Sequence, residues 1–236
     1  MIYKIFGVSF YDINFKQFWR IKSKGLIVLP SGPGLSTIYS DKIYHKSIQN
    51  ADIALFDSGY FVLLLRLLKG LKVSKFSGYK FLKLFLKAYK TKNFFAVEVD
   101  RKSAIINSKY LKKYSIDVSN RQYIAPIYKK NSYIMDSILL NNLKKNKPFV
   151  ILINLGGGTQ EVLGSYLKNN LNYKPLIICT GAAISFLTKR QAPISKFIDN
   201  IFMGWAVRII FNPIVFLPRY LSAFKLLFFI WNTKIK

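Results

Sequence analysis

The sequence contains one cysteine and one histidine, and each scarcity excludes a class of site. Cys179 has no partner for a disulfide within the chain, which fits a reducing compartment such as the cytoplasm. His45 alone cannot build a multi-histidine metal site, and any Ser-His-Asp triad would have to use it. Because it stands in a polar, helix-like stretch, we expect His45 on the surface.

Acidic residues are also few: ten Asp and Glu stand against 37 Lys and Arg, a formal net charge of +27. Such an excess implies an anionic partner, which could be nucleic acid, an anionic membrane surface or a phosphate-bearing substrate. The lysines are scattered between apolar residues, and neither an arginine-rich tract nor a helix-turn-helix pattern is present. We therefore expect a membrane surface and no nucleic acid. Salt-sensitive binding to generic duplex would support the rival interpretation.

Long apolar runs and flexible linkers are missing too. No window offers about twenty uninterrupted apolar residues, the length that spans a bilayer, so we expect no transmembrane helix. Residues 1–7 lack the apolar core and cleavage site of a signal peptide. With 51% apolar residues and no Gly/Ser/Pro-rich linker, the 236 residues suit one large domain, alone or with an appendage.

What the sequence does contain is an alternation of short apolar runs and amphipathic stretches. This pattern predicts an α/β fold, a Rossmann-like parallel sheet flanked by helices. The expected strands are residues 5–11, 26–29, 53–56, 94–99, 123–128, 150–153 and 176–179. The expected helices are residues 15–22, 35–49, 60–68, 81–89, 103–114, 134–143 and 160–169.

The central stretch is Ile151 to Glu161, where a strand buried on both faces runs into a glycine loop. Ligands of open α/β sheets bind at such strand ends, and glycines allow the backbone to approach them. Thr159 is the expected cap of the next helix, with Gln160 in its first turn. The loop could instead be a turn without a ligand, since it matches neither a Walker loop nor G-x-G-x-x-G. Its candidate ligand-binding residues are Gly156, Gly157, Gly158, Gln160 and Glu161.

A general base must come from the ten acids, and most of them fall away from the carboxyl ends of the expected strands. Those near such ends are Asp57, Glu161 and the pair Glu98 and Asp100. Asp57 is the preferred candidate, because it ends a buried strand and precedes Ser-Gly, where the backbone can turn tightly. Its alternative role is to cap the helix that starts near residue 60. No Asp-x-Asp motif is present, so we expect no metal at the site, and a diphosphate would need arginines or helix N-termini.

The character of the chain changes at residue 192. Residues 193–231 are apolar and aromatic, interrupted by charges that include Arg208 and Arg219. Pro213 and Pro218 are expected to break this segment into short helices. It could pack on the domain or lie in a membrane interface, and the excess of basic residues favours the interface. We therefore divide the chain into a core of residues 1–191 and a helical, membrane-associating appendage of residues 192–236.

Five segments in this order resemble the WecG/TagA/CpsF glycosyltransferases, glycosyltransferase family 26. Residues 5–8 resemble the opening strand of that family. The other four segments that resemble the family are Asn50-Ala-Asp52 with Phe56-Asp57-Ser-Gly59 and Arg66; Leu155-Gly-Gly-Gly-Thr-Gln-Glu161; Gly181-Ala-Ala with Phe186 and Ala192-Pro193; and Trp205, Arg208, Pro213, Arg219 and Tyr220.

The resemblance implies metal-independent, inverting transfer of an N-acetylmannosamine-like N-acetylhexosamine from a UDP-sugar to a polyprenyl-diphosphate-linked acceptor. It implies no cofactor, a cytoplasmic protein bound peripherally to the inner face of the plasma membrane, possible homo-oligomers, and a role in teichoic-acid, common-antigen or capsule synthesis. It assigns the base to Asp57 and the sugar pocket to Gln160. Gly181 and Ser185 stand where donor contacts are expected, and Arg190, Arg208 and Arg219 where diphosphate contacts are.

The sequence also departs from the family pattern. Ser31 and Ser58 replace an asparagine and a glycine, Ser185 replaces an aspartate, and Gln191 replaces an arginine with Arg190 displaced by one. Because Asp57, Gln160 and Glu161 remain together, we expect an altered donor or acceptor. The alternative is a catalytically degenerate membrane-surface partner of a polysaccharide assembly complex.

Overall fold

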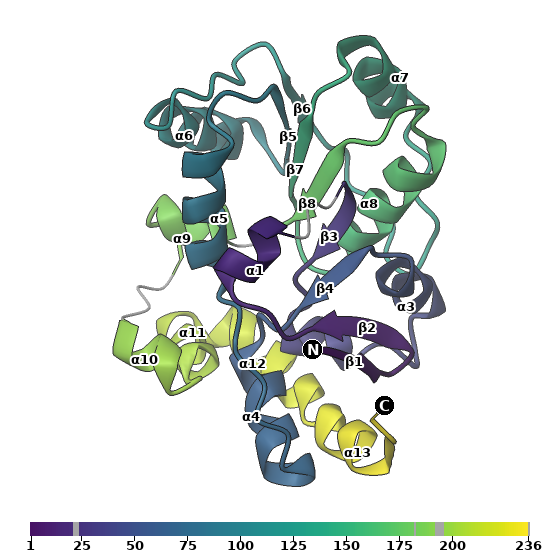
Figure 1. Cartoon of the computed structure of the whole chain (residues 1–236), viewed down its shortest axis with the longest axis vertical. Helices are drawn as coiled ribbons and strands as arrows, with labels where there is room; N and C mark the ends of the chain where they lie inside the picture. Colours follow the sequence, from purple (N-terminus) through teal and green to yellow (C-terminus); the bar gives the residue numbers. More distant parts are fainter. Residues whose placement is uncertain (21–23, 182, 192–195, 236) are drawn as a thin grey trace.

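A computed structural model describes residues 1–20, 24–181, 183–191 and 196–235. An eight-stranded sheet runs through its centre in the order β1-β2-β4-β3-β8-β7-β5-β6, and only β1 and β2 pair antiparallel (Figure 1). The strands are β1 (Ile2–Ile5), β2 (Val8–Tyr11), β3 (Gly25–Val28), β4 (Ile53–Leu55), β5 (Phe94–Glu98), β6 (Gln122–Ile124), β7 (Val150–Asn154) and β8 (Leu176–Cys179). The predicted α/β class and mostly parallel sheet are confirmed.

The central strands owe their position to continuous apolar sequence. Every residue of β4, β5, β7 and β8 is buried, so each strand has helices over both faces. Parallel register, for example Ile151 opposite Ile177, brings the carboxyl ends of these strands to one edge of the sheet. The loops that follow them therefore meet at that edge.

Helices form a layer on each face of the sheet (Figure 1). One apolar cluster joins the sheet to α1 (Phe15–Arg20), α5 (Gly78–Ala88), α6 (Arg101–Lys112) and α9 (Ala183–Leu187). The other joins it to α2 (Gly32–Leu35), α3 (Lys42–Gln49), α4 (Gly59–Lys69), α7 (Ser137–Asn146) and α8 (Thr159–Asn170). Residues 21 and 22, expected to end the first helix, lie outside the described ranges.

The prediction of one continuous strand over residues 5–11 is wrong, because β1 and β2 form a hairpin that turns within this stretch. Phe6 and Gly7 form its two-residue turn with φ of 55° and 77°. Positive φ at both positions is what a tight hairpin turn requires. His45 fixes this hairpin, because its Nε2 lies 2.6 Å from the Phe6 carbonyl oxygen. The histidine is half-buried, so its predicted surface position is only partly right.

The expected helix 35–49 is also wrong, since two helices occupy this stretch. α2 ends at Leu35, and α3 begins at Lys42 because the Asp41 carboxylate accepts the Tyr44 N–H across 2.9 Å. Aspartate is a strong N-cap, so Asp41 interrupts the helical pattern and starts a new one. The break places Gly32 at the carboxyl edge of the sheet, beside Ser58 and Tyr60.

The C-terminal segment consists of α10 (Lys196–Asn200), α11 (Gly204–Phe211), α12 (Pro213–Ala223) and α13 (Lys225–Asn232). Pro213 opens α12 behind the Asn212 cap, whereas Pro218 lies inside α12 and does not break it. By length and composition alone, residues 213–232 could cross a membrane, contrary to our expectation. One face of this stretch is nevertheless buried in the core of the sheet, through Tyr220, Ala223, Leu226 and Ile230. The division at residue 192 stays a prediction, and residues 192–195 are not among those described.

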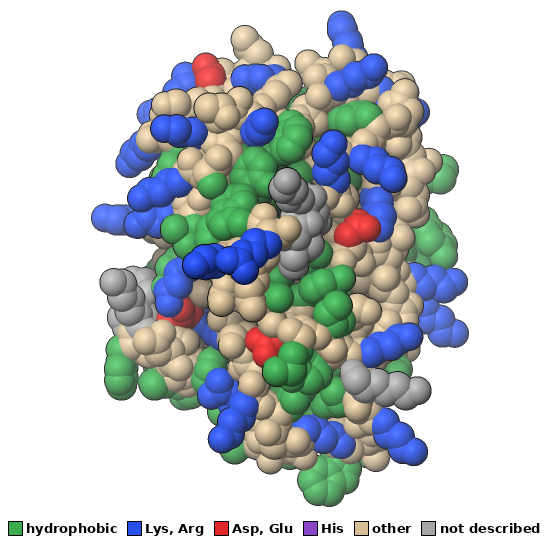
Figure 2. Space-filling view, viewed as in Figure 1, with side chains coloured by type: hydrophobic (Ala, Val, Ile, Leu, Met, Phe, Trp, Pro, Cys, Tyr) green, Lys and Arg blue, Asp and Glu red, His purple; other side chains and the backbone are tan. Residues whose placement is uncertain are grey.

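Charge is distributed over the surface as the sequence suggests. Figure 2 shows Lys and Arg side chains around the rim of this face, few acidic side chains, and apolar patches between them. The lysines thus form no single continuous tract on this face. Such a pattern raises attraction to anionic surfaces in general without selecting one ligand.

Candidate active site

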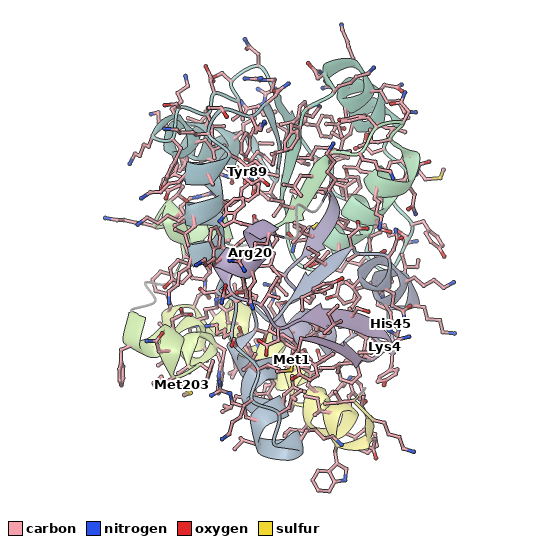
Figure 3. All side chains as sticks on the ribbon, in the orientation of Figure 1. Met1, Lys4, Arg20, His45, Tyr89 and Met203 are labelled. Atoms are coloured by element: carbon pink, nitrogen blue, oxygen red, sulfur yellow. The ribbon has the colours of Figure 1, made fainter. Side chains whose placement is uncertain are left out.

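A cavity of about 310 Å³ lies at the carboxyl edge of the sheet. The loops after β3, β4, β7 and β8 form one side of it, and α11 and α12 form the other. Eight of the predicted site residues line it: Asp57, Gly156, Gly157, Gln160, Gly181, Ser185, Arg208 and Arg219. Gly158, Glu161 and Arg190 do not. His45 does not line the cavity, and Figure 3 shows it on the side of the view opposite Met203 of the C-terminal segment.

Asp57 follows β4 and faces the start of α5. Its Oδ1 accepts the Gly78 N–H across 2.6 Å, and among the described residues we find no hydrogen bond to its other oxygen. Its alternative role as a helix cap is wrong, because Ser58 caps α4 by accepting the Phe61 N–H. The carboxylate is thus held at one oxygen and faces the cavity, which is the arrangement a general base needs.

Burial and the neighbouring charges shift the pKa of the Asp57 carboxyl in opposite directions. Burial raises the pKa of the Asp57 carboxyl, whereas the Lys75 ammonium and the Gly78 N–H oppose that rise without cancelling it. A raised pKa makes the carboxylate a stronger proton acceptor, because basicity increases with the pKa.

Lys75 and Asp199 belong to this site although the sequence did not indicate them. Asp199, on α10, forms ion pairs with Lys75 and, across 2.6 Å, with Lys80. Burial raises the pKa of Asp199, but the hydrogen bonds from the two lysines outweigh burial and lower it. The ion pair between Lys75 and Asp199 therefore joins the C-terminal segment to the strand-end loops beside Asp57. Lys75 is one of many scattered lysines, and we considered Asp199 too far from any strand end, so no local signal identified either.

The glycine loop is fixed by Glu161, which is buried behind it. Gly158, with φ of 93°, caps α8 in place of the expected Thr159, and its N–H reaches Glu161 Oε2 across 2.7 Å. Glu161 Oε1 accepts from Gln160 Nε2 across 2.9 Å, and Gln160 Oε1 accepts the Gly181 N–H across 2.7 Å. Burial raises the pKa of Glu161 to about 7. Glu161 thus orients Gln160 and contributes no wall to the cavity.

Arg190 lies outside the cavity and ties the loop after α9 to α6. Its guanidinium donates to Ser103 Oγ across 2.7 Å and to Asn107 Oδ1 across 2.9 Å, both on α6. Gln191, the next residue, lines the cavity instead. The predicted diphosphate contact from Arg190 therefore has no support from its position.

Arg208 and Arg219 line the first cavity and also a second one, of about 290 Å³. The Arg208 guanidinium lies 4.6 Å from the centre of the Phe186 ring, a cation–π distance. The second cavity is further lined by Lys129, Lys130 and the loop at Gly158. Two arginines of the C-terminal segment thus bring positive charge to the boundary between the two spaces.

The family model for WecG/TagA/CpsF glycosyl transferases matches residues 3–236. The chain belongs to this family. No curated protein matches the sequence. Membership in the WecG/TagA/CpsF family makes the chain a glycosyltransferase and implies, in general terms, a sugar-nucleotide donor and a lipid-linked acceptor.

The departures from the WecG/TagA/CpsF pattern occupy two kinds of position. Ser31 caps α2 by accepting the Gly34 N–H across 3.2 Å, and Ser58 caps α4, so both hydroxyls support local structure. Ser185 and Gln191 line the cavity. Ser31 and Ser58 line the cavity as well, so all four departures of this WecG/TagA/CpsF member can bear on a ligand, although the hydroxyls of Ser31 and Ser58 are already engaged as helix caps. Ala182 and the Ala192-Pro193 pair of the family motif are not described.

Metal ligands of the usual kind do not gather at this site. Within the described ranges, no group of three or more His, Cys, Asp or Glu side chains is placed to hold an ion. Metal independence, predicted above, stays a prediction.

Proposed function

We propose that this WecG/TagA/CpsF glycosyltransferase transfers an N-acetylhexosamine from a UDP-sugar to a polyprenyl-diphosphate-linked acceptor. The observation that carries the proposal is the shared cavity: Asp57, held by Gly78, faces the same space as Arg208 and Arg219. A base and two cations in one cavity suit transfer from a diphosphate leaving group, which needs a proton acceptor and stabilisation of the charge that develops.

The reaction we infer is a single displacement. The acceptor hydroxyl gives its proton to the free oxygen of Asp57 while its oxygen forms a bond to the anomeric carbon of the donor sugar. The bond from that carbon to the diphosphate oxygen breaks, and UDP leaves with the electron pair. Arg208, Arg219 and Lys75 stabilise the developing charge, so the step needs no metal. One displacement from the opposite face inverts the anomeric configuration.

The donor is held by the opposite wall of the cavity. Gly156 and Gly157 allow the backbone to approach the ligand, and Gln160, fixed by Glu161 and the Gly181 N–H, presents its amide to the sugar. Ser185 and Gln191 replace charged residues of the family pattern in this cavity. We propose that these neutral side chains adapt the site to a different N-acetylhexosamine.

The lipid part of the acceptor points to a membrane location. Apolar side chains are exposed along the C-terminal segment: Ile210 at 81%, Ile214 at 88% and Phe228 at 70%. We propose that this face lies in the inner leaflet of the plasma membrane as a peripheral contact. A spanning arrangement would pull Tyr220 and Leu226 out of the core that buries them and would expose the apolar residues beneath them to water. The products would be teichoic-acid, common-antigen or capsule precursors, and self-association stays a prediction.

The test is acceptor-dependent release of UDP from a panel of UDP-N-acetylhexosamines, with a polyprenyl-diphosphate-sugar acceptor in detergent. We expect release by the natural protein and its loss in Asp57→Asn. Asp117→Asn, the same change at an exposed site, should keep full activity. Folded protein that binds vesicles but releases no UDP from any donor would favour the catalytically degenerate partner instead, a candidate suggested by Ser185 and Gln191.

A further inference from the structure

A buried carboxylate that the proposed reaction does not use lies at the end of β5. Glu98 is 1% exposed, and each of its oxygens accepts one amide N–H. Asn107 Nδ2 donates to Oε2 across 2.7 Å, and Asn154 Nδ2 donates to Oε1 across 2.8 Å. Asn154 ends β7 and lines the first cavity, so this buried network reaches the ligand space.

The orientation of both amides follows from Arg190, which can only donate. Its guanidinium occupies Asn107 Oδ1, so the NH2 group of Asn107 must face Glu98. The Glu98 carboxylate offers only acceptors, so the NH2 group of Asn154 must face it as well. The carbonyl oxygen of Asn154 is thereby turned away from Glu98.

That carbonyl oxygen is incompletely satisfied. Its one partner among the described residues is the Thr180 hydroxyl, at a long 3.4 Å. A carbonyl oxygen carries two lone pairs, and buried polar groups are rarely left without good partners. Thr180 lines the cavity as well, so a ligand there can supply the missing N–H.

We propose that Asn154 determines donor specificity by accepting a hydrogen bond from an N–H group of the nucleotide sugar. This inference rests on the proposed function. In a UDP-N-acetylhexosamine that N–H belongs either to the imide of the base or to the acetamido group of the sugar. A cytosine base presents a lone pair where uracil presents its imide N–H, and a 2-deoxyhexose lacks the acetamido N–H and carries no hydroxyl in its place. Either change leaves the Asn154 acceptor unpaired, and sites built for a hydrogen bond reject such analogues strongly.

Glu98→Gln is the informative variant because it reverses the orientation of the network. Arg190 still fixes Asn107, so the carbonyl of the new amide accepts from Asn107 and its NH2 group faces Asn154. Asn154 then turns its own carbonyl toward residue 98 and presents NH2 to the cavity. The site should now favour a ligand acceptor over a ligand donor.

The experiment compares dissociation constants by calorimetry for UDP against CDP, and for a UDP-N-acetylhexosamine against the matching UDP-2-deoxyhexose. It is done at about pH 8, above the pKa of about 7 to which burial raises Glu98. In the natural protein we expect one of these ratios to favour the N–H ligand at least about fivefold, and Glu98→Gln to remove that preference. Asp100→Asn is the matched control: the same chemical change two residues away, at a helix cap that accepts the Ser103 N–H across 2.6 Å. It should leave both ratios unchanged, since asparagine caps helices equally well.

The two ratios separate the two sources of the N–H. A change in the UDP to CDP ratio assigns the contact to the base, and a change in the N-acetylhexosamine to 2-deoxyhexose ratio assigns it to the sugar. If Glu98→Gln does not fold, Asn154→Ala takes its place and should bring the same ratio close to one. Unchanged ratios in a folded variant overturn the inference while nucleotide binding still supports the proposed function. Failure of the folded natural protein to bind any of the four ligands overturns the proposed function itself.

Discussion

The Gly78 N–H donates to Asp57 Oδ1 across 2.6 Å, so the first peptide group of α5 holds the carboxylate that faces the cavity. A Cβ atom at residue 78 would lie 3.2 Å from that oxygen and 3.2 Å from Leu29 Cδ2. An alanine here would therefore press on both side chains and shift them by a few tenths of an ångström, although the φ of residue 78 is ordinary.

Gly78→Ala should slow the reaction without unfolding the protein. Alanine favours a helix over glycine by about 1 kcal/mol, which offsets part of the crowding. Displacement of the base by a few tenths of an ångström should lower kcat about tenfold or more. Rates of UDP release and thermal melts of the same preparation measure both quantities. An unchanged kcat would contradict the positioning role of Gly78.

Asp199→Asn should destabilise the contact between the C-terminal segment and the core. Asp199 is 4% exposed and Lys75 12%, so the change leaves a buried ammonium without its partner. Breaking buried pairs costs about 3 kcal/mol, and the half-exposed Lys80 reduces the penalty. Urea unfolding measures the loss. Asp117→Asn, which removes an exposed pair with Lys112 at 3.9 Å, should leave the midpoint unchanged. Equal midpoints for both variants would show that the Asp199 pair contributes nothing.

Stability should fall as the pH rises through about 7. Burial raises the pKa of Glu98 and of Glu161 from 4.5 to about 7, so the folded protein binds these two protons more tightly than the unfolded chain does. The resulting stabilisation is complete below the unfolded value and is lost above the folded one, roughly 3 kcal/mol for each group. Free energies of unfolding from pH 5 to pH 9, measured in urea, test this dependence. Glu98→Gln should flatten the slope, and an unaltered slope would count against the raised pKa.

Vesicle binding should depend on the exposed face of the C-terminal segment. Replacing Ile214 and Phe228 together by serine should weaken sedimentation with anionic vesicles at least about tenfold, because each apolar side chain contributes on the order of 1.5 kcal/mol or more when buried. Ile138→Ser is the control: this side chain is 70% exposed on α7, as Phe228 is on α13. Unchanged binding of the double variant would indicate general electrostatic attraction in place of a dedicated face, and equal loss in the control would show that any exposed apolar side chain has the same effect.

Local sequence predicted the parts of this molecule that local forces determine. The buried strands at residues 150–153 and 176–179 follow from continuous apolar runs, and Asp57 from its place after one of them. The errors arose where a single residue outweighs a pattern: positive φ at Phe6 and Gly7, and the Asp41 cap. Lys75 and Asp199 meet only because segments distant in the sequence pack together. The orientation of Gln160 depends on the Glu161 carboxylate, which the sequence indicated as a ligand contact. Arg190 shows the reverse case, a family-like arginine whose donors are already occupied.

The placement of Arg208, Arg219 and Asp199 on the C-terminal helices also bears on when the protein can act. All eight strands and Asp57 are synthesised before any of these three residues leaves the ribosome. Until α10–α12 close over the strand ends, the cavity lacks one wall and both of its arginines, and Lys75 lacks its Asp199 partner. On the proposed mechanism, a nascent or prematurely terminated chain therefore cannot consume nucleotide sugars, and activity arrives together with the helices that we propose contact the lipid.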